Sequence, residues 1–277
     1  FMGINAYELP AGEFIRWLKI TRSYPAIYGH APKGNLALME SLAKAMRAQG
    51  GEIWTRCETK QILVTDEVAR GVVVQTDKDE MEIASRVVIS NAGPQKTVEL
   101  AGSENFDKGY LKQMKESLRP ASSIMIHTVS DRPLLEHADS LILTEARRVN
   151  WIACPTEACP ELAPPGKHLM VSYSTPAFNF PPYDFDQEIA WHLQDLKENI
   201  PRFGSEGDIL AVNCFHGEWP AFRTWLGYDL PQKTPIENLY NVGDAVKPSG
   251  RTGLPASVAS GRMVVEDVKS RIKPGEA

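Results

Sequence analysis

The sequence contains no GxGxxG segment, no block of basic residues and no apolar run long enough for a membrane-spanning helix. Lysine and arginine number 30 against 35 aspartate and glutamate, so the chain is slightly acidic. These absences argue against nucleic acid as a partner and against a membrane-spanning protein. With 277 residues, the chain is still long enough to bury a sizeable core in one large or two modest domains.

Cysteine is also scarce. The sequence has four, and none is spaced CxxC or lies near a cluster of histidines: Cys57, Cys154, Cys159 and Cys214. Metal sites built on cysteine need such spacing, so we predict that the protein binds no metal. Free thiols in a reducing compartment are the expected state, which favours a cytoplasmic location. Peripheral contact with a membrane surface is the alternative.

The most informative stretch lies near the end of the chain, at residues 239–261. It begins with a short apolar run, residues 239–242, of the length of a buried strand, and Gly243-Asp244 ends that run with a turn and a carboxylate. A loop rich in Gly, Pro and Ser follows, and the sequence then predicts a helix to about Ile272 with Pro255 in its first turn. The start of that helix would present unpaired backbone N–H groups and the positive end of the helix dipole.

This arrangement is suited to hold a polyhydroxylated, partly anionic cofactor. A carboxylate accepts hydrogen bonds from hydroxyls, and a helix N-terminus attracts electron-rich groups. Small residues at the start of the predicted helix let another backbone or a flat ligand approach closely: Gly253, Ala256, Ala259, Ser260 and Gly261. From these residues alone, an ordinary strand–loop–helix unit with a solvated aspartate is an equally acceptable interpretation.

The same residues resemble a known family. Gly243-Asp244 and residues 253–261, with the pattern G-[IL]-P-x-x-x-x-S-[GA], are similar to the C-terminal flavin-binding motif of FAD-dependent oxidoreductases of the phytoene desaturase and amine oxidase superfamily. The intervening loop, residues 247–252, is longer than in many relatives. The resemblance implies a set of cofactor-binding residues at this end: Gly243, Asp244, Gly253, Leu254 and Pro255.

A second block, which ends at Pro94, also resembles this family. Its pattern is a turn, a helix, a Gly-Gly-Glu-Ile segment, a pair of strands and a Val-Ile-Ser-Asn-x-x-Pro turn. The resemblance implies that Thr59 lies where relatives grip the adenine through the backbone, and that Asn91, Gly93 and Pro94 lie near the pyrophosphate side of the cofactor. Judged without the family, residues 90–94 are a plain strand-to-helix turn.

Hydrophobic periodicity predicts the remaining elements. Helices are expected over residues 8–22, 33–50 and 186–199, and from residue 95; strands are expected over residues 52–55, 60–64, 71–75, 81–83, 86–90, 123–129, 140–143, 151–154, 168–174 and 209–215. The sequence thus predicts an α/β (α+β) fold with two domains. Residues 32–96 and 236–272 would form a partial FAD-binding, Rossmann-like domain. Residues 1–31 and 97–235 would form a substrate-binding domain with a mostly antiparallel sheet and flanking helices.

No catalytic residue stands out in the sequence. His127, on a predicted strand, and His216 with the nearby Glu218 are isolated side chains of a kind that is more often structural than catalytic. Arg251, beside the flavin-like motif, could offset negative charge on a reduced ring or could face solvent. Aromatic residues of the predicted substrate-binding domain would line an apolar cavity or fill a core: Trp151, Tyr173, Phe178, Phe180, Trp219, Phe222 and Trp225.

The missing GxGxxG segment matters because this superfamily places the pyrophosphate of its cofactor on the helix that follows it. The resemblance covers residues 31–272 and only the back half of a family member. We therefore expect this chain to be the C-terminal part of an FAD-dependent oxidoreductase. Elements beside the missing unit should expose apolar surface, covered by a second copy of the chain or by an N-terminal half.

The resemblance implies FAD as the cofactor of the intact protein, rather than of this chain alone, and transfer of hydride from a hydrophobic small molecule to the flavin. Phytoene dehydrogenase-like chemistry is the first expectation. Flavin amine oxidation and protoporphyrinogen oxidation are alternatives within the enzyme class. Outside that class, the alternative is a non-catalytic fragment or a partner subunit that binds a lipid.

Overall fold

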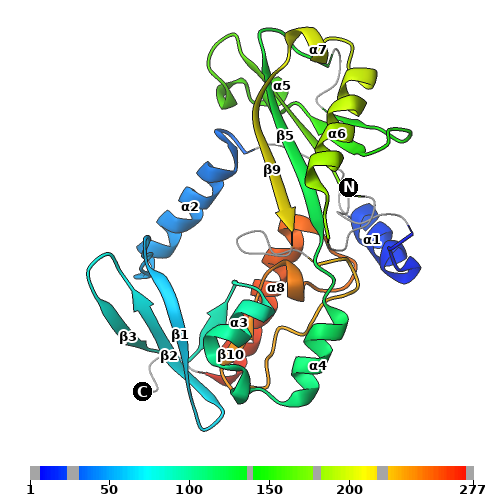
Figure 1. Ribbon diagram of the computed structural model, residues 1–277. Helices are drawn as coiled ribbons and strands as arrows, with labels where there is room; N and C mark the ends of the chain where they lie inside the picture. Colours follow the sequence, from blue (N-terminus) through cyan, green and yellow to red (C-terminus); the bar gives the residue numbers. More distant parts are fainter. Residues whose placement is uncertain (1–6, 24–30, 136–139, 177–181, 217–223, 273–277) are drawn as a thin grey trace.

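The computed structural model describes residues 7–23, 31–135, 140–176, 182–216 and 224–272. Figure 1 shows an elongated molecule with a group of elements at each end and helix α2 (Gly34–Ala48) between them. A five-stranded sheet dominates one group; a three-stranded and a two-stranded sheet lie in the other. This mixed α/β architecture confirms the predicted fold class.

The five-stranded sheet is antiparallel between all its neighbours, as predicted, and has the order β6-β7-β8-β5-β9. Its strands are β5 (Ser122–Ser130), β6 (Ser140–Ile142), β7 (Val149–Ala153), β8 (His168–Ser174) and β9 (Asp208–His216). Helix α6 (Phe185–Asn199) and the short helix α7 (Phe203–Glu206) pack on the sheet, where Leu196 and Phe203 share a core with Ile152 and Met170. Two further short helical turns, α5 (Pro155–Ala158) and η2 (Pro160–Leu162), precede β8.

The three-stranded sheet is an antiparallel meander of β1 (Glu58–Thr65), β2 (Val68–Gln75) and β3 (Glu80–Ala84). Asp66 and Glu67 form the tight turn between β1 and β2 with φ of 50° and 60°, the conformation that matches the twist of a two-residue hairpin. Gly71 allows β2 to lie against β3, because a Cβ there would be 2.2 Å from the backbone oxygen of Ile83.

The two-stranded sheet pairs β4 (Val88–Ser90) with β10 (Leu239–Asn241) in parallel, although the two strands are far apart in the chain. Helices α3 (Pro94–Ala101), α4 (Lys108–Ser117) and α8 (Gly253–Arg271), with the turns η1 (Ser103–Asn105) and η3 (Asp244–Val246), lie at this end of the molecule. Their core contains residues from both sides of position 96: Ile62, Val88, Val98, Phe106, Tyr110, Ile236 and Leu239. Packing therefore crosses the boundary predicted between residues 96 and 97, and the division into two domains stays a prediction.

One local prediction was wrong. Residues 52–55 form no strand, since no strand of the described part of the chain pairs with them, and Trp54 is exposed. Helix α4 was not predicted; it begins after an N-cap at Asp107, whose side chain accepts a hydrogen bond from the N–H of Tyr110. The other predicted helices and strands are present, with α1 (Ala11–Ser23) at the N-terminal end.

Helix α2 is unusual because none of its residues is buried. Its sequence is amphipathic, and its apolar residues are exposed: Leu36, Leu38, Met39, Leu42 and Met46. A helix of this length is only marginally stable in water without packing, and its apolar residues lie exposed along it in this structure.

Candidate functional site

The predicted cofactor motif begins where β4 and β10 end side by side. The N–H of Val242 donates to the backbone oxygen of Ser90, at a distance of 2.9 Å. Behind this pair, the hydroxyl oxygen of Thr97 lies 2.7 Å from both Ser90 Oγ and Asn241 Oδ1, and 2.9 Å from the oxygen of Gly93. Because Ser90, Thr97 and Asn241 are buried, this polar cluster fixes the two strand ends relative to the start of α3.

Gly243 brings the two predicted cofactor segments into contact. Its φ is 107°, and a Cβ at this position would lie 2.4 Å from Oδ1 of Asn91 at the end of β4. Its N–H donates to Oγ of Ser260 in α8, at 2.8 Å. The strand end, the turn after β4 and helix α8 therefore meet at a residue that only glycine can occupy without displacement.

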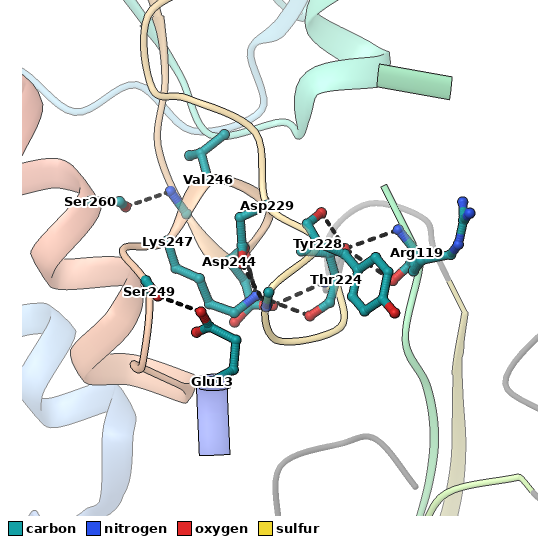
Figure 2. A network of polar contacts seen from close by, with 12 residues as sticks. Glu13, Arg119, Thr224, Tyr228, Asp229, Asp244, Val246, Lys247, Ser249 and Ser260 are labelled. Carbon is teal, nitrogen blue, oxygen red and sulfur yellow. Dashed lines mark hydrogen bonds and ion pairs between the residues drawn. The ribbon is translucent and has the colours of Figure 1, made fainter. Parts of the chain in front are cut away.

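Asp244 follows with a carboxylate that is held on one side. Its Oδ2 accepts the N–H of Thr224 at 3.1 Å and lies 3.4 Å from Nζ of Lys247. Among the described residues, none donates to Oδ1. Figure 2 shows Asp244 at the centre of this network, between the loop that contains Thr224 and the loop that leads to α8.

Lys247 and Asp229 complete the network (Figure 2). The Lys247 side chain is only 2% exposed, and its Nζ lies 2.8 Å from Oδ1 of Asp229. The other carboxylate oxygen of Asp229, Oδ2, accepts the N–H of Gly227. Burial raises the pKa of Asp229 to about 6, and the nearby charge of Lys247 only partly opposes that rise. Burying charges is costly unless they are paired, and here each has a partner.

A second buried carboxylate holds the same loop from the other side. Glu13, on α1, accepts the N–H of Gly250 at 2.7 Å and the hydroxyl of Ser249 at 2.5 Å, and it pairs with Arg16. Burial by itself would raise the pKa of Glu13, but these hydrogen bonds and the charge of Arg16 outweigh it, and the pKa is lowered. Figure 2 shows Glu13 reaching Ser249 at the side of the loop.

The N-terminus of α8 is open. Thr252 makes no side-chain capping bond to the helix, and the first turn contains no acidic residue. Gly253 has a φ of 63°, and a Cβ there would meet no atom within 4 Å. Leu254 is 53% exposed and Pro255 is also exposed. Unpaired N–H groups and the positive end of a 19-residue helix thus face unfilled space, which suits a ligand with anionic or electron-rich groups.

A groove of about 540 Å³ brings together predicted residues from the other cofactor segment. Thr59, at the start of β1, and Asn91, after β4, both line it. The other lining residues are Cys57, Glu58, Ile62, Val72, Val88, Ile89, Ser90, Ala92, Lys96 and Leu100. Because Asn91 also touches Gly243, the groove and the Gly-Asp turn are contiguous. Gly93, with a φ of 90°, and Pro94 are buried at the start of α3 and support this turn.

The other candidates lie elsewhere. His127 is half-buried on β5, with Nδ1 3.3 Å from Nδ2 of Asn213. His216 packs with the rings of Tyr183 and Phe185 at the end of β9. Arg251 is half-buried in the loop before α8. Glu218 and four of the predicted cavity aromatics fall outside the described residues: Phe178, Phe180, Trp219 and Phe222. The predicted loop at residues 24–30 also falls outside them.

The sequence predicted no metal site, and the four cysteines considered in that prediction all lie among the described residues. Within the described ranges, no three His, Cys, Asp or Glu side chains are grouped so that they could hold a metal ion. None of the four cysteines forms a disulfide.

Glu13, Asp229, Lys247 and the anchoring role of Ser260 could not be predicted from the sequence. Glu13 lies 236 residues from Ser249 in sequence, so no local pattern could have connected them. Lys247 was visible only as one residue of a loop that is long for the motif. The one available signal for the role of Lys247 was that a charged residue lies inside a segment of Gly, Pro and Ser.

The fold and this motif place the chain among flavin-dependent oxidoreductases. The family model for flavin containing amine oxidoreductases matches residues 12–269, so the chain belongs to that family. Membership implies a flavin cofactor, and the open N-terminus of α8, the half-anchored carboxylate of Asp244 and the groove at Thr59 and Asn91 fit such a ligand.

Individual proteins resemble the chain in sequence or in fold. An uncharacterized protein of Methanocaldococcus jannaschii is 28% identical over 255 residues, which cover 91% of this chain and 57% of that protein. The crystal structure of an oxidoreductase from Methanosarcina mazei superposes with a TM-score of 0.85 at 30% identity, covering 96% of this chain and 61% of that one. A putrescine oxidase with bound putrescine shares the fold at a TM-score of 0.59 and 14% identity, over 87% of this chain and 54% of that one. The chain thus spans little more than half the length of these relatives.

Among the described residues, no helix is both long and apolar enough to cross a membrane.

Proposed function

We propose that this chain supplies the flavin end and the adenine side of the FAD site of an oxidoreductase. The observation that carries the proposal is the meeting of Asn91 and Gly243, which joins the groove at Thr59 to the Gly-Asp turn and the open start of α8. FAD extends over two such segments, since it has an adenine at one end and a flavin at the other. A smaller flavin would need only one of them.

Each part of the site has a distinct task toward the cofactor. Oδ1 of Asp244 would accept a hydrogen bond from a hydroxyl of the cofactor's sugar-alcohol chain, because Oδ2 is already used by Thr224 and Lys247. Gly253, Leu254 and Pro255 would place the first turn of α8 against the electron-rich edge of the flavin. Backbone atoms at Thr59 would bind the adenine, and the turn at Asn91, Gly93 and Pro94 would lie near the pyrophosphate.

The flavin, when bound, supplies the capacity to accept a hydride from a carbon–hydrogen bond. The protein's part is to hold the ring, to shape an apolar cavity and to exclude water. A hydrophobic small molecule of the carotenoid-precursor type is our first substrate, because the motif leans toward phytoene dehydrogenase-like proteins. An amine is the second candidate, supported by the family match and by the shared fold of putrescine oxidase.

The proposal includes a partner for the exposed apolar surface. The edge of β4 that does not pair with β10 has no neighbouring strand in the described part of the chain, and Ile89 there is 45% exposed. Parallel strands are normally buried on both faces. The exposed helix α2 and residues 51–55, which form no strand, lead into this group of elements just before β1. Two partners would cover this edge and this helix. One is an N-terminal half that brings further strands and gives the protein the length of its relatives; the other is a second copy of this chain. We propose a cytoplasmic location, with membrane contact limited to the surface.

The direct test is to purify the protein from its complete natural coding sequence and to identify any released flavin by chromatography. We expect FAD, with an absorbance spectrum typical of a bound flavin. The variant Asp244→Ala should bind FAD roughly tenfold or more weakly, because the cofactor loses a hydrogen bond to a charged group. A matched control is Asp267→Ala, which removes a partly exposed carboxylate of α8 outside the site.

The outcomes separate the alternatives. FMN in place of FAD would contradict the proposed FAD site. No flavin at all would contradict the proposal and favour a non-catalytic, lipid-binding protein. Unchanged FAD affinity in Asp244→Ala would remove Asp244 from the site. Anaerobic bleaching of the flavin by a polyene precursor, by putrescine or by a porphyrinogen would then identify the substrate class.

A further inference from the structure

We propose that Lys247 and Glu13 are positioning residues for flavin binding: their buried charges, contributed by opposite ends of the sequence, hold the loop between β10 and α8 in the conformation that the cofactor requires. The inference rests on the proposed function. Neither side chain needs to touch the cofactor, and each acts through the loop that does.

Lys247 has used all its donors. Its ammonium group lies 3.0 Å from the backbone oxygen of Thr224, 2.7 Å from that of Asp244 and 2.8 Å from Oδ1 of Asp229. An ammonium has three N–H bonds, so this group is saturated within the protein. A lysine on a glycine- and proline-rich loop would ordinarily extend into water. Here it points inward and ties the loop to the segment that contains Thr224 and Asp229 (Figure 2).

The consequence falls on Asp244. Oδ2 accepts the N–H of Thr224 and lies 3.4 Å from the positive charge of Lys247, so rotation of the carboxylate would lose the hydrogen bond and the electrostatic contact. Oδ1 is then presented in one orientation, with no described residue donating to it. Anchoring one oxygen of a carboxylate and leaving the other as an acceptor is what a site for a hydroxylated ligand requires, because the orientation is set before the ligand arrives.

Glu13 performs the matching task at the other end of the loop. Its two oxygens accept the N–H of Gly250 and the hydroxyl of Ser249. Helix α1 sits directly on this part of the loop, since a Cβ on Gly250 would lie 2.8 Å from Cβ of Arg16. Glu13 is itself the buried residue of α1. Gly250 is close in sequence to Gly253, so the position of α1 determines where the first turn of α8 begins.

The loop is thereby fixed at two points: Lys247 ties it to Asp229, and Glu13 of α1 holds Ser249 and Gly250. A loop of this length would otherwise sample many conformations, and the cofactor would have to order it on binding. Pre-ordering by Lys247 and Glu13 removes that cost. The geometry also explains how a loop longer than in many relatives can serve the same motif.

The test compares FAD affinity with the stability of the flavin-free protein in four variants of the protein made from its complete coding sequence. Lys247→Met leaves two buried carboxylates without a counter-charge and is expected to lower stability. The double variant Lys247→Met with Asp229→Asn removes the excess charge, so its melting temperature should return close to that of the wild type. Glu13→Gln keeps the size of the side chain but weakens its bonds to the loop. Lys233→Met is the matched control, because Lys233 is an exposed lysine that pairs with Asp267 outside the network.

We expect the double variant to bind FAD roughly 10–100-fold more weakly than the wild type in spite of its recovered stability, since the loop loses its tie to Asp229 and Asp244 loses the neighbouring positive charge. Glu13→Gln should weaken binding roughly tenfold, and in both cases the visible absorbance bands of the bound flavin should shift. Lys233→Met should change neither affinity nor spectrum. Wild-type affinity and spectrum in the double variant and in Glu13→Gln would overturn the inference and leave the proposed function standing. A wild-type protein that binds no FAD would overturn both.

Discussion

At the scale of single residues, the protein relies on buried polar side chains whose protonation states are set by their surroundings. His192, on α6, is fully buried, and its ring nitrogens lie 2.7 Å from the hydroxyls of Ser172 and Ser174 on β8. Burial lowers the pKa of His192 to about 4, although the nearby Asp195 carboxylate opposes that change. The imidazole is therefore neutral in the folded protein at all but acidic pH, and it joins α6 to the five-stranded sheet.

This histidine predicts a specific dependence of stability on pH. Between pH 6.5 and about 4, the unfolded chain takes up a proton at residue 192 and the folded protein does not. Stability therefore falls as the pH falls through this window, by roughly 3 kcal/mol in total from this group. The measurement is the free energy of urea unfolding at several pH values for the wild type and for His192→Asn.

The variant should be less stable at neutral pH, and its pH profile should lack this slope. His168→Asn, at a partly exposed position on the same sheet, is the control and should keep the slope. Parallel profiles for the wild type and His192→Asn would show that residue 192 does not titrate in this way.

At the scale of elements, α8 is the helix whose N-terminus would lie against the flavin. It begins at Gly253 with no acidic residue in its first turn and no side-chain cap, and it ends with Lys269 and Arg271 in its last turn. Basic residues near the C-terminus stabilise the helix dipole, whereas the N-terminal end has no such compensation. An uncompensated N-terminus lowers the stability of a helix and leaves its attraction for an anionic ligand unused.

Leu254→Asp should therefore change stability and binding in opposite directions. A carboxylate in the first turn should stabilise the flavin-free protein by about 0.5 kcal/mol through the helix dipole. The same charge should repel the cofactor and weaken FAD binding. Leu254→Asn, which has nearly the same size without the charge, is the matched control. Tighter FAD binding by the Asp variant than by the Asn variant would contradict this role for α8.

The elements also show where sequence patterns were sufficient. The strand β5 was visible because its residues alternate along a two-faced sheet, and α6 was visible from its apolar stripe. Helix α4 was missed because its sequence contains few apolar residues, and it is held by Tyr110 in a core shared with residues from distant strands. Residues 52–55 have a strand-like composition, but a strand forms only beside a partner, and no strand of the described ranges pairs with them.

At the scale of the whole molecule, apolar side chains are exposed at several places. Helix α2 exposes Leu36 and Leu42, and α8 exposes Val258 and Val265, which are seven residues apart and so lie on one face. The free edge of β4 adds Ile89. Clusters of exposed apolar residues are typical of surfaces that another polypeptide covers.

The chain of residues 1–277 by itself should therefore associate with increasing concentration. Light scattering of the wild type should show a mass above that of a monomer, 30.7 kDa, at high protein concentration. The double variant Leu36→Lys with Leu42→Glu should reduce that association without loss of folding, because both side chains are exposed. A wild-type chain that stays monomeric at high concentration would argue against an apolar contact surface on α2.

The sequence by itself determined the elements that are coded locally. The alternation of apolar residues identified strands such as β5, and Gly243-Asp244 with the Gly-Leu-Pro start of α8 identified the family and predicts one end of the cofactor site. These signals are readable because each depends on residues a few positions apart: a turn that needs glycine, a helix that tolerates proline at its start, and a strand with a buried face.

Only the tertiary structure decided how that motif is held. Glu13 reaches Ser249 and Gly250 across nearly the whole length of the chain, and Thr224 and Asp229 reach Lys247 and Asp244 from a separate loop. Buried charges are stable only where partners surround them in space, and such partners leave no periodic pattern in sequence. The same reason applies to residues 52–55. Their composition predicted a strand, but they form none because no neighbouring strand pairs with them in the described structure.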